Sequence, residues 1–164
     1  MHSCSELNGL RKGIARQWFS VTIGNNPIEE AWLSGGLALF LGLLEQPGDI
    51  SAAITAEHRY LRTRLPHVQE ELRRLNTGVD RYENFEDYIL VQRRKAQLMF
   101  YALYREMGAE NFKYLLREYY RQFAFQNATA ADFIELAEDI HGQSLLEFFD
   151  HWLNTSELPD LPAR

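Results

Sequence analysis

Two cationic side chains lie four residues apart near the start of the sequence, in residues 12–19, which read KGIARQWF. Residues four apart on a helix share one face, so Lys12 and Arg16 would present their charges side by side. Both side chains offer only hydrogen-bond donors at neutral pH, and their charge repels a divalent metal ion. The pair is therefore suited to an anion such as the C-terminal carboxylate of a peptide, and not to a metal.

A second segment, WLSGGLA at residues 32–38, follows downstream. Together the two segments resemble the zinc-binding core of the M1 (gluzincin) aminopeptidases, where they read H-E-x-x-H-Q-W-F and W-L-N-E-G-F-A. The matching positions are Gln17, Trp18, Phe19, Trp32, Leu33, Gly36 and Ala38. The resemblance implies that the two segments form neighbouring helices that frame the place of a zinc site.

At every position where the family binds the metal, this chain carries a different residue. In the family, two histidines bind zinc, and the glutamate between them acts as general base on the metal-bound water. Lys12 and Arg16 stand at the histidine positions, and Gly13 stands at the position of the base. The third ligand is a glutamate after eighteen intervening residues, and Gly35 stands at that position. The sequence therefore predicts neither a metal nor a catalytic base at these positions.

Residues 91–96, VQRRKA, resemble the stretch in which the family carries Y-x-K-G. The tyrosine of that motif stabilises the oxyanion of the transition state. Lys95 matches the lysine, Ala96 replaces the glycine, and Arg93 stands at the tyrosine position. Tyr88 lies earlier on the same predicted helix and takes the tyrosine's place only in a different register. The resemblance therefore implies that the oxyanion-stabilising group is missing.

The same resemblance implies that Lys12, Arg16 and Arg93 converge where zinc and the tyrosine would lie. Two interpretations follow. The three cations form a basic pocket that accepts a carboxylate, or they fill the space electrostatically, paired with Glu29, Glu30 or another acid.

The resemblance covers about residues 10–161, and its last part, LLEFFDHWL at residues 145–153, is similar to the family's F-F-x-x-W-L ending. It fits only the C-terminal helical lobe of a thermolysin-like catalytic domain. The β-rich part of such a domain, with its G-x-M-E-N segment, has no counterpart in this sequence. We therefore expect residues 1–164 to form a single M1-peptidase-like helical domain that is part of a larger protein.

Helical periodicity and capping signals predict an all-α, multi-helix domain with short connections. Asn26 with Glu29 and Ser144 with Glu147 are capping-box patterns, and Thr129 is a further N-cap. The predicted helices cover residues 7–18, 27–46, 50–65, 68–75, 86–107, 110–125, 130–140 and 145–152.

Composition is typical of one globular domain, since 46% of the 164 residues are hydrophobic and 13% are aromatic. The net charge of −6 gives no reason to expect nucleic acid as a partner. The most apolar run, residues 35–44, is shorter than the roughly 20 residues that a membrane span needs. The first residues contain no apolar signal-peptide segment. We expect a soluble domain, and the sequence does not indicate its compartment.

The sequence therefore favours a catalytically inactive M1 aminopeptidase-like domain that serves as a scaffold or as an interaction module, with no cofactor. We expect its partner to be a protein, a peptide, another part of a longer chain or a second copy. The β-rich part that would cover these helices in the family has no counterpart in this sequence, and a surface that evolved to be covered tends to be apolar. The alternative is a zinc-dependent aminopeptidase domain or fragment, for which zinc would be the cofactor.

Overall fold

The computed structural model describes residues 22–161, and this part of the chain is built from helices. The α-helices are α2 (Ala31–Leu44), α3 (Ile50–Arg64), α4 (Phe85–Tyr88), α5 (Ala96–Met107), α6 (Ala109–Phe123), α7 (Ala130–His141) and α8 (Leu146–Asn154). The 3₁₀ segments are η1 (Leu65–His67), η2 (Glu70–Arg73) and η3 (Val79–Arg81), and η4 (Ile89–Lys95) is a π-helix. Extended backbone within residues 22–161 pairs only at a bridge between Gly24 and Asn127. The predicted all-α class is confirmed.

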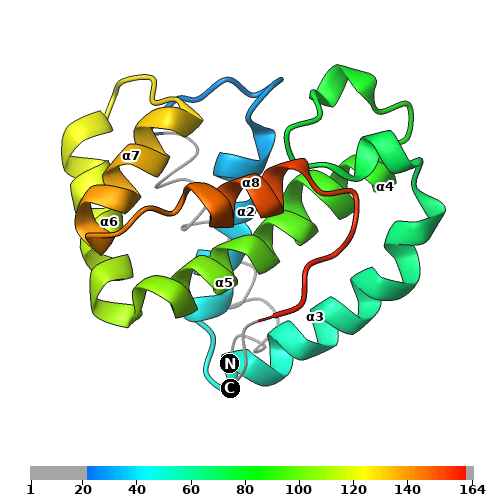
Figure 1. The fold of residues 1–164 in the computed structure, drawn as a ribbon, viewed down its shortest axis with the longest axis horizontal. Helices are drawn as coiled ribbons and strands as arrows, with labels where there is room; N and C mark the ends of the chain where they lie inside the picture. The colour runs from blue at the N-terminus through cyan, green and yellow to red at the C-terminus, as the bar shows by residue number, and fades with distance from the viewer. Residues whose placement is uncertain (1–21, 162–164) are drawn as a thin grey trace, which may run out of the picture.

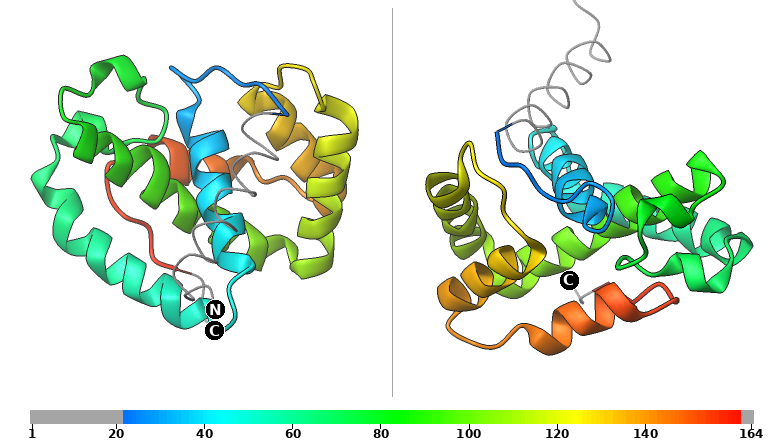
Figure 2. Two further views of the ribbon diagram at one scale, coloured as in Figure 1. Left: turned by 180° about the vertical axis from the view of Figure 1, so that it is seen from behind. Right: turned by 90° about the horizontal axis from the view of Figure 1, so that it is seen from above.

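Helix α5 lies at the centre of the fold. Figure 1 shows it crossing the middle of the molecule, and the view from above in Figure 2 shows α2 on one side of it and α8 on the other. Helices α6 and α7 lie toward one end of α5, and α3 and α4 lie toward the opposite end. Because other helices surround α5, most of its side chains are buried.

Aromatic side chains join these helices in the core. The rings of Trp32 in α2 and Phe100 in α5 have centroids 6.1 Å apart, and Phe100 meets Phe133 of α7 edge-on at 5.9 Å. Further along α2, Phe40 meets Phe112 of α6 edge-on at 5.6 Å. All five side chains are at most 2% exposed. Full burial of a large apolar side chain contributes about 1.5–3 kcal/mol, so these contacts fix α2 relative to its neighbours.

Helix α2 begins later than the sequence predicts. Asn26 does accept hydrogen bonds from the backbone N–H groups of Ile28 and Glu29, at 3.0 and 3.2 Å. These bonds close an isolated turn, and Glu30 instead of Asn26 directly precedes α2. The Glu30 carboxylate accepts from the backbone N–H of Ala130, the first residue of α7, at 2.9 Å. This long-range bond accompanies Glu30 at the N-cap position of α2, so the local capping signal at Asn26 does not mark the helix start.

The helix predicted over residues 68–75 is wrong, because only the four-residue 3₁₀ segment η2 forms there. The carbonyl groups of this stretch accept from side chains. Arg73 donates through Nε to the carbonyl of Val68 at 2.8 Å, and Lys95 donates through Nζ to the carbonyl of Arg73 at 2.8 Å. These bonds satisfy the backbone without a helical ladder.

A π-helix interrupts the long helix predicted over residues 86–107. The helices α4, η4 and α5 follow one another directly, but η4 has the wider turns of a π-helix over seven residues. Single π segments inside α-helices often mark functional sites. Here the segment places Gln92 and Lys95 in the core, both 0% exposed, and places Arg93 against α2.

The cap predicted at Thr129 is confirmed for α7, but the capping box predicted at Ser144 with Glu147 is wrong. Glu138 in α7 takes the expected role of Glu147. Its carboxylate accepts from the Ser144 hydroxyl at 2.8 Å and from the Leu145 backbone N–H at 2.7 Å. The start of α8 is therefore bound by the preceding helix, and the Ser144 hydroxyl accepts from the Leu146 backbone N–H at 3.2 Å.

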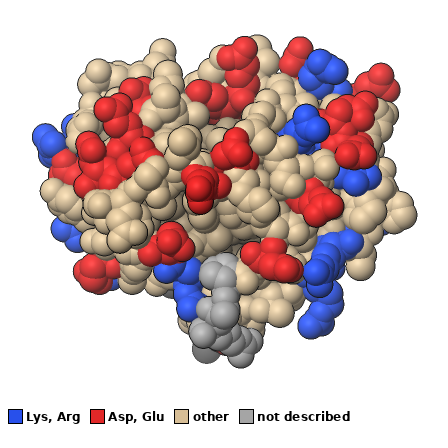
Figure 3. All heavy atoms as spheres, viewed as in Figure 1, with Lys and Arg blue, Asp and Glu red and all other residues tan. Residues whose placement is uncertain are grey.

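The surface in Figure 3 carries acidic side chains across its whole breadth, whereas basic side chains lie mostly toward its edges. This distribution agrees with the net charge of −6. Within residues 22–161, every helix is too short or too polar to cross a membrane.

Candidate functional site

Gly35 of α2 and Arg93 of η4 lie against each other. A Cβ atom placed on Gly35 would lie 3.1 Å from Arg93 Cγ and 3.6 Å from Arg93 Nε. The arginine therefore uses the space that a side chain at position 35 would need. The structure thus brings together the position of the third zinc ligand and the position of the tyrosine, as the sequence resemblance assigns them.

The guanidinium of Arg93 has few partners among the described residues. Its Cζ atom lies 5.7 Å from the centroid of the Tyr88 ring, which is a cation–π contact. Its Nε atom is shielded from solvent and has no hydrogen-bond partner within residues 22–161. Glu29 and Glu30, the acids expected as partners, accept hydrogen bonds from an amide and a backbone N–H elsewhere. Neither of these acids neutralises the charge of Arg93.

Arg93 lines a cavity of about 400 Å³ between α2, α3 and η4. An ion pair forms part of the wall, because Arg94 donates through Nε at 2.5 Å and through Nη2 at 2.7 Å to the two carboxylate oxygens of Glu57. The hydrogen bond with Glu57 raises the pKa of Arg94, whose Cζ also lies 4.1 Å from the Tyr60 ring centroid. The remaining lining residues are Leu39, Leu43, Gln46, Ala53, Ile89 and Gln97.

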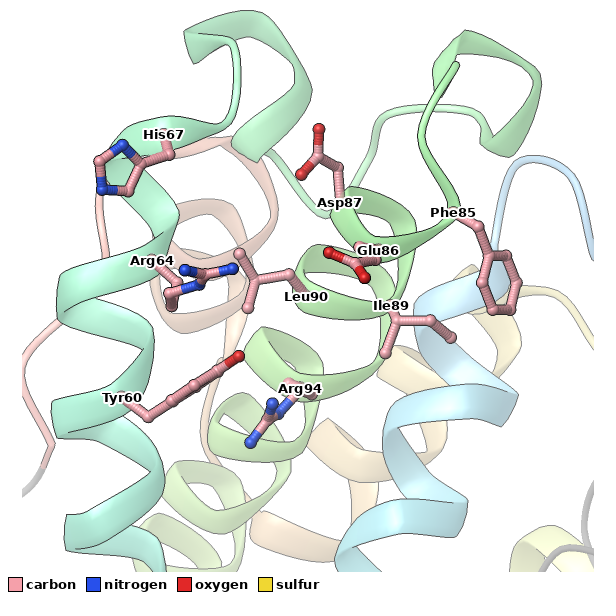
Figure 4. Close-up of a pocket in the computed structure, with 9 residues that line it drawn as sticks. All are labelled: Tyr60, Arg64, His67, Phe85, Glu86, Asp87, Ile89, Leu90 and Arg94. Carbon is pink, nitrogen blue, oxygen red and sulfur yellow. The ribbon is translucent and has the colours of Figure 1, made fainter.

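An adjoining groove of about 550 Å³ lies between α3 and α4 and shares Arg94 with this cavity. Figure 4 shows Arg64 and His67 on one side of the groove and Glu86 and Asp87 on the other. None of these four side chains forms an ion pair with another residue in the described part of the chain. The Arg64 guanidinium on one side and the two carboxylates on the other therefore remain available to a ligand.

Gly36 allows α2 to pack closely against the start of α5. A Cβ atom on Gly36 would lie 2.4 Å from the Cβ of Ala96 and 3.0 Å from its carbonyl carbon. Carbon atoms that are not bonded to each other pack at about 3.5–4.0 Å, so a side chain at position 36 would force the helices apart. This close approach keeps Gly35 beside Arg93.

Two buried side chains of η4 form hydrogen bonds with the backbone of two other segments. These are the connection that precedes α4 and the C-terminal tail. Lys95 donates through Nζ to the carbonyl oxygens of Arg73 and Thr155, both at 2.8 Å, and Gln92 donates to the carbonyl of Thr77 at 3.0 Å. Burial lowers the pKa of Lys95 to about 7, and the nearby charge of Arg73 adds to this shift. The lysine that matches the family motif therefore binds backbone and lies away from the cavity.

The other positions singled out in the sequence, Lys12, Gly13 and Arg16, lie outside the described residues. Sequence reasoning missed the pair of Glu57 and Arg94, which come together across 37 residues. No local spacing pattern could have indicated this pair, because its partners lie on different helices.

The residues at the centre of this site do not fit a zinc ion. Gly35 supplies no ligand atom from a side chain, and the Arg93 guanidinium beside it brings a positive charge. Within residues 22–161, no group of three or more His, Cys, Asp and Glu side chains could hold a metal ion.

The sequence profile of the peptidase family M1 domain matches residues 12–152. No curated protein matches the sequence. Among solved structures, the M1 zinc metallopeptidase from Deinococcus radiodurans has a TM-score of 0.73 and 22% identity, over 95% of this chain and 35% of that one. A mutant of a two-domain M1 zinc metallopeptidase bound to L-tryptophan has a TM-score of 0.74 and 22% identity, over 96% and 35%.

A mutant of the Deinococcus radiodurans enzyme bound to a Tyr-Ser-Ala substrate has a TM-score of 0.72 and 21% identity, over 95% of this chain and 34% of that one. At these identities the likeness shows a shared fold. The present chain spans about a third of the length of these peptidases.

Proposed function

The chain belongs to peptidase family M1, and we propose that it is a catalytically inactive member that acts as a scaffold or as an interaction module for proteins or peptides. We also propose that it is one domain of a longer protein, because it spans about a third of the solved M1 peptidases that it resembles. In this proposal the helices keep the fold of a peptidase lobe but lack the residues that hydrolysis requires.

The contact of Gly35 with Arg93 carries this proposal. A zinc peptidase of this family needs a ligand side chain where Gly35 stands, and here the Arg93 side chain lies against that position. The substitutions of Lys12, Gly13 and Arg16 for the family's histidines and glutamate, which are features of the sequence alone, point the same way.

The groove of Figure 4 supports an interaction role. Its two sides carry charges of opposite sign that form no ion pairs within residues 22–161. Phe85, at 72% exposed, and Tyr60, at 40% exposed, add aromatic surface to the same groove. Exposed aromatic rings beside unpaired charges are the features that protein and peptide interfaces use for affinity and orientation.

An activity assay tests the proposal. The purified chain is incubated with an aminoacyl p-nitroanilide, with added zinc and, in a parallel sample, with a chelator. We expect no turnover above the enzyme-free rate in either sample, because Gly35 offers no ligand and Gly13 offers no general base. Hydrolysis that requires zinc and stops with the chelator would refute the inactive reading.

A zinc-dependent aminopeptidase is the second candidate. The family membership favours it, and so do the solved structures with this fold, which are zinc metallopeptidases. This function would need a set of zinc ligands that Gly35 and Arg93 do not provide. The same activity assay distinguishes the two candidates.

A further inference from the structure

The cavity between α2, α3 and η4 contains a cation that has no counter-ion among residues 22–161. The Arg93 side chain is half-buried, and no ion pair links its guanidinium to any residue in the described part of the chain. Its shielded Nε has no acceptor there. A buried donor without a partner is unfavourable, because the group has lost its hydrogen bond to water without gaining another. Such a cost is expected where a residue serves binding.

Glu57, the acid that lines the cavity, does not form an ion pair with Arg93. Both carboxylate oxygens of Glu57 accept hydrogen bonds from Arg94. The amide nitrogen of Gln97 is also engaged, because it donates to the carbonyl oxygen of Leu39 at 3.2 Å. These wall groups are thus engaged elsewhere, and within residues 22–161 Arg93 lacks a counter-ion.

The shape of the site restricts the ligand further. The backbone at Gly35 and the ring of Tyr88 confine the arginine from two sides, which limits the directions in which its guanidinium can point. A planar guanidinium binds a carboxylate through two parallel hydrogen bonds. The apolar lining residues Leu39, Leu43 and Ile89 suit a hydrocarbon group next to that carboxylate.

We infer that this cavity is a binding site for a carboxylate attached to an apolar group, with Arg93 as the residue that binds it. This inference rests on the proposed function, because it assigns the former catalytic space to a ligand in place of a metal. The carboxylate can belong to a small organic acid or to the C-terminus of a peptide. Both sources present the same chemistry to Arg93.

The test uses the complete chain and nitrogen NMR of the Arg93 side chain, whose shielded Nε–H gives a signal protected from exchange. The probes are butyrate, acetyl-Ala-Ala with a free carboxylate, and the amide of the same dipeptide. We expect the two acids to shift the Arg93 signal with a dissociation constant of roughly 1 mM and the amide to leave it in place. Tighter binding of acetyl-Ala-Ala than of butyrate identifies a peptide C-terminus, and equal binding identifies a small acid.

Variants of Arg93 test whether this residue binds the carboxylate. The Arg93→Met chain should bind the acids at least about tenfold more weakly, followed through backbone signals of α2, and it should be no less stable than the parent in urea. Arg93→Lys keeps the charge but loses the planar fork, so we expect intermediate binding. Arg117→Met, which removes an exposed arginine on α6, is the matched control and should bind as the parent does.

Shifts of equal size with the amide, no shift with any probe, or unchanged binding by Arg93→Met would each overturn the inference. These outcomes are independent of the activity assay. A chain without zinc-dependent turnover that also binds no carboxylate refutes the inference alone, whereas zinc-dependent turnover refutes the proposed function.

Discussion

Replacing Gly36 with alanine is expected to lower the free energy of unfolding by about 2 kcal/mol. The new Cβ would lie 2.4 Å from the Cβ of Ala96 and 3.0 Å from its carbonyl carbon, and neither atom belongs to a flexible chain end. Alanine gains about 1 kcal/mol over glycine in helix propensity, but the forced separation of α2 from α5 outweighs this gain. Urea denaturation followed by circular dichroism measures the effect as a lower midpoint.

The neighbouring glycine provides the matched control. Alanine at Gly35 has the same gain in propensity, and its Cβ would meet the Cγ of Arg93 at 3.1 Å. A flexible side chain can move by the few tenths of an ångström required, so Gly35→Ala should stay within about 1 kcal/mol of the parent. Adding Ala96→Gly to Gly36→Ala should restore part of the lost stability. If the two single variants were equally stable, the helices could not be as close as the structure places them.

Deprotonation of Lys95 is expected to raise the free energy of unfolding by about 2 kcal/mol as the pH rises from 7 to 9. Burial lowers its pKa to about 7 in the folded chain, against an ordinary value of 10.5. Between these values the unfolded chain binds more protons than the folded chain, so stability increases as the pH rises. Below pH 7 both states are protonated, and the destabilisation by the buried charge is fully present.

The variant Lys95→Met isolates this contribution. It leaves the carbonyl groups of Arg73 and Thr155 without their donor, so it should be less stable than the parent at pH 9. Its stability should change much less between pH 7 and pH 9, as urea denaturation at both values would measure. The pH range ends at 9 because Tyr82 affects stability at higher pH. Its pKa is raised to about 12 in the folded chain, so this tyrosine ionises first in the unfolded chain, which lowers the free energy of unfolding near pH 10 and above. Equal increases in both proteins would refute the role of Lys95.

The family and the all-α class can be predicted from the sequence because the matching residues belong to the packing of the fold. Trp32 is 2% exposed and packs against Phe100, and Gly36 permits the close approach to Ala96. Residues with such packing roles leave a recognisable pattern even where residues of the metal site differ. Local capping chemistry likewise predicts the start of α7 at Thr129.

The sequence cannot predict features that depend on contacts between distant residues. Glu30 binds the start of α7 and delays α2, and Glu138 takes the role expected of Glu147 at α8. The π-helix η4 has no marker in the local sequence, yet it places Lys95 and Arg93 on different sides. In each case a tertiary interaction decides between local conformations of similar energy.

The candidate site is predictable only in part for the same reason. The resemblance indicates that Gly35 and Arg93 occupy former functional positions, and the structure adds that they are in contact. The pairing of Arg94 with Glu57 and the unpaired Nε of Arg93 follow only from the folded chain. These two observations support the proposed carboxylate site, and neither can be obtained from local sequence patterns.

The most direct test of the central proposal is a measurement of bound zinc. The purified chain is equilibrated with zinc, dialysed against zinc-free buffer and analysed for metal per chain. We expect a zinc content well below one ion per chain, because Gly35 supplies no ligand and Arg93 carries a positive charge beside it. One zinc ion retained per chain would refute the proposal that the metal site has been lost.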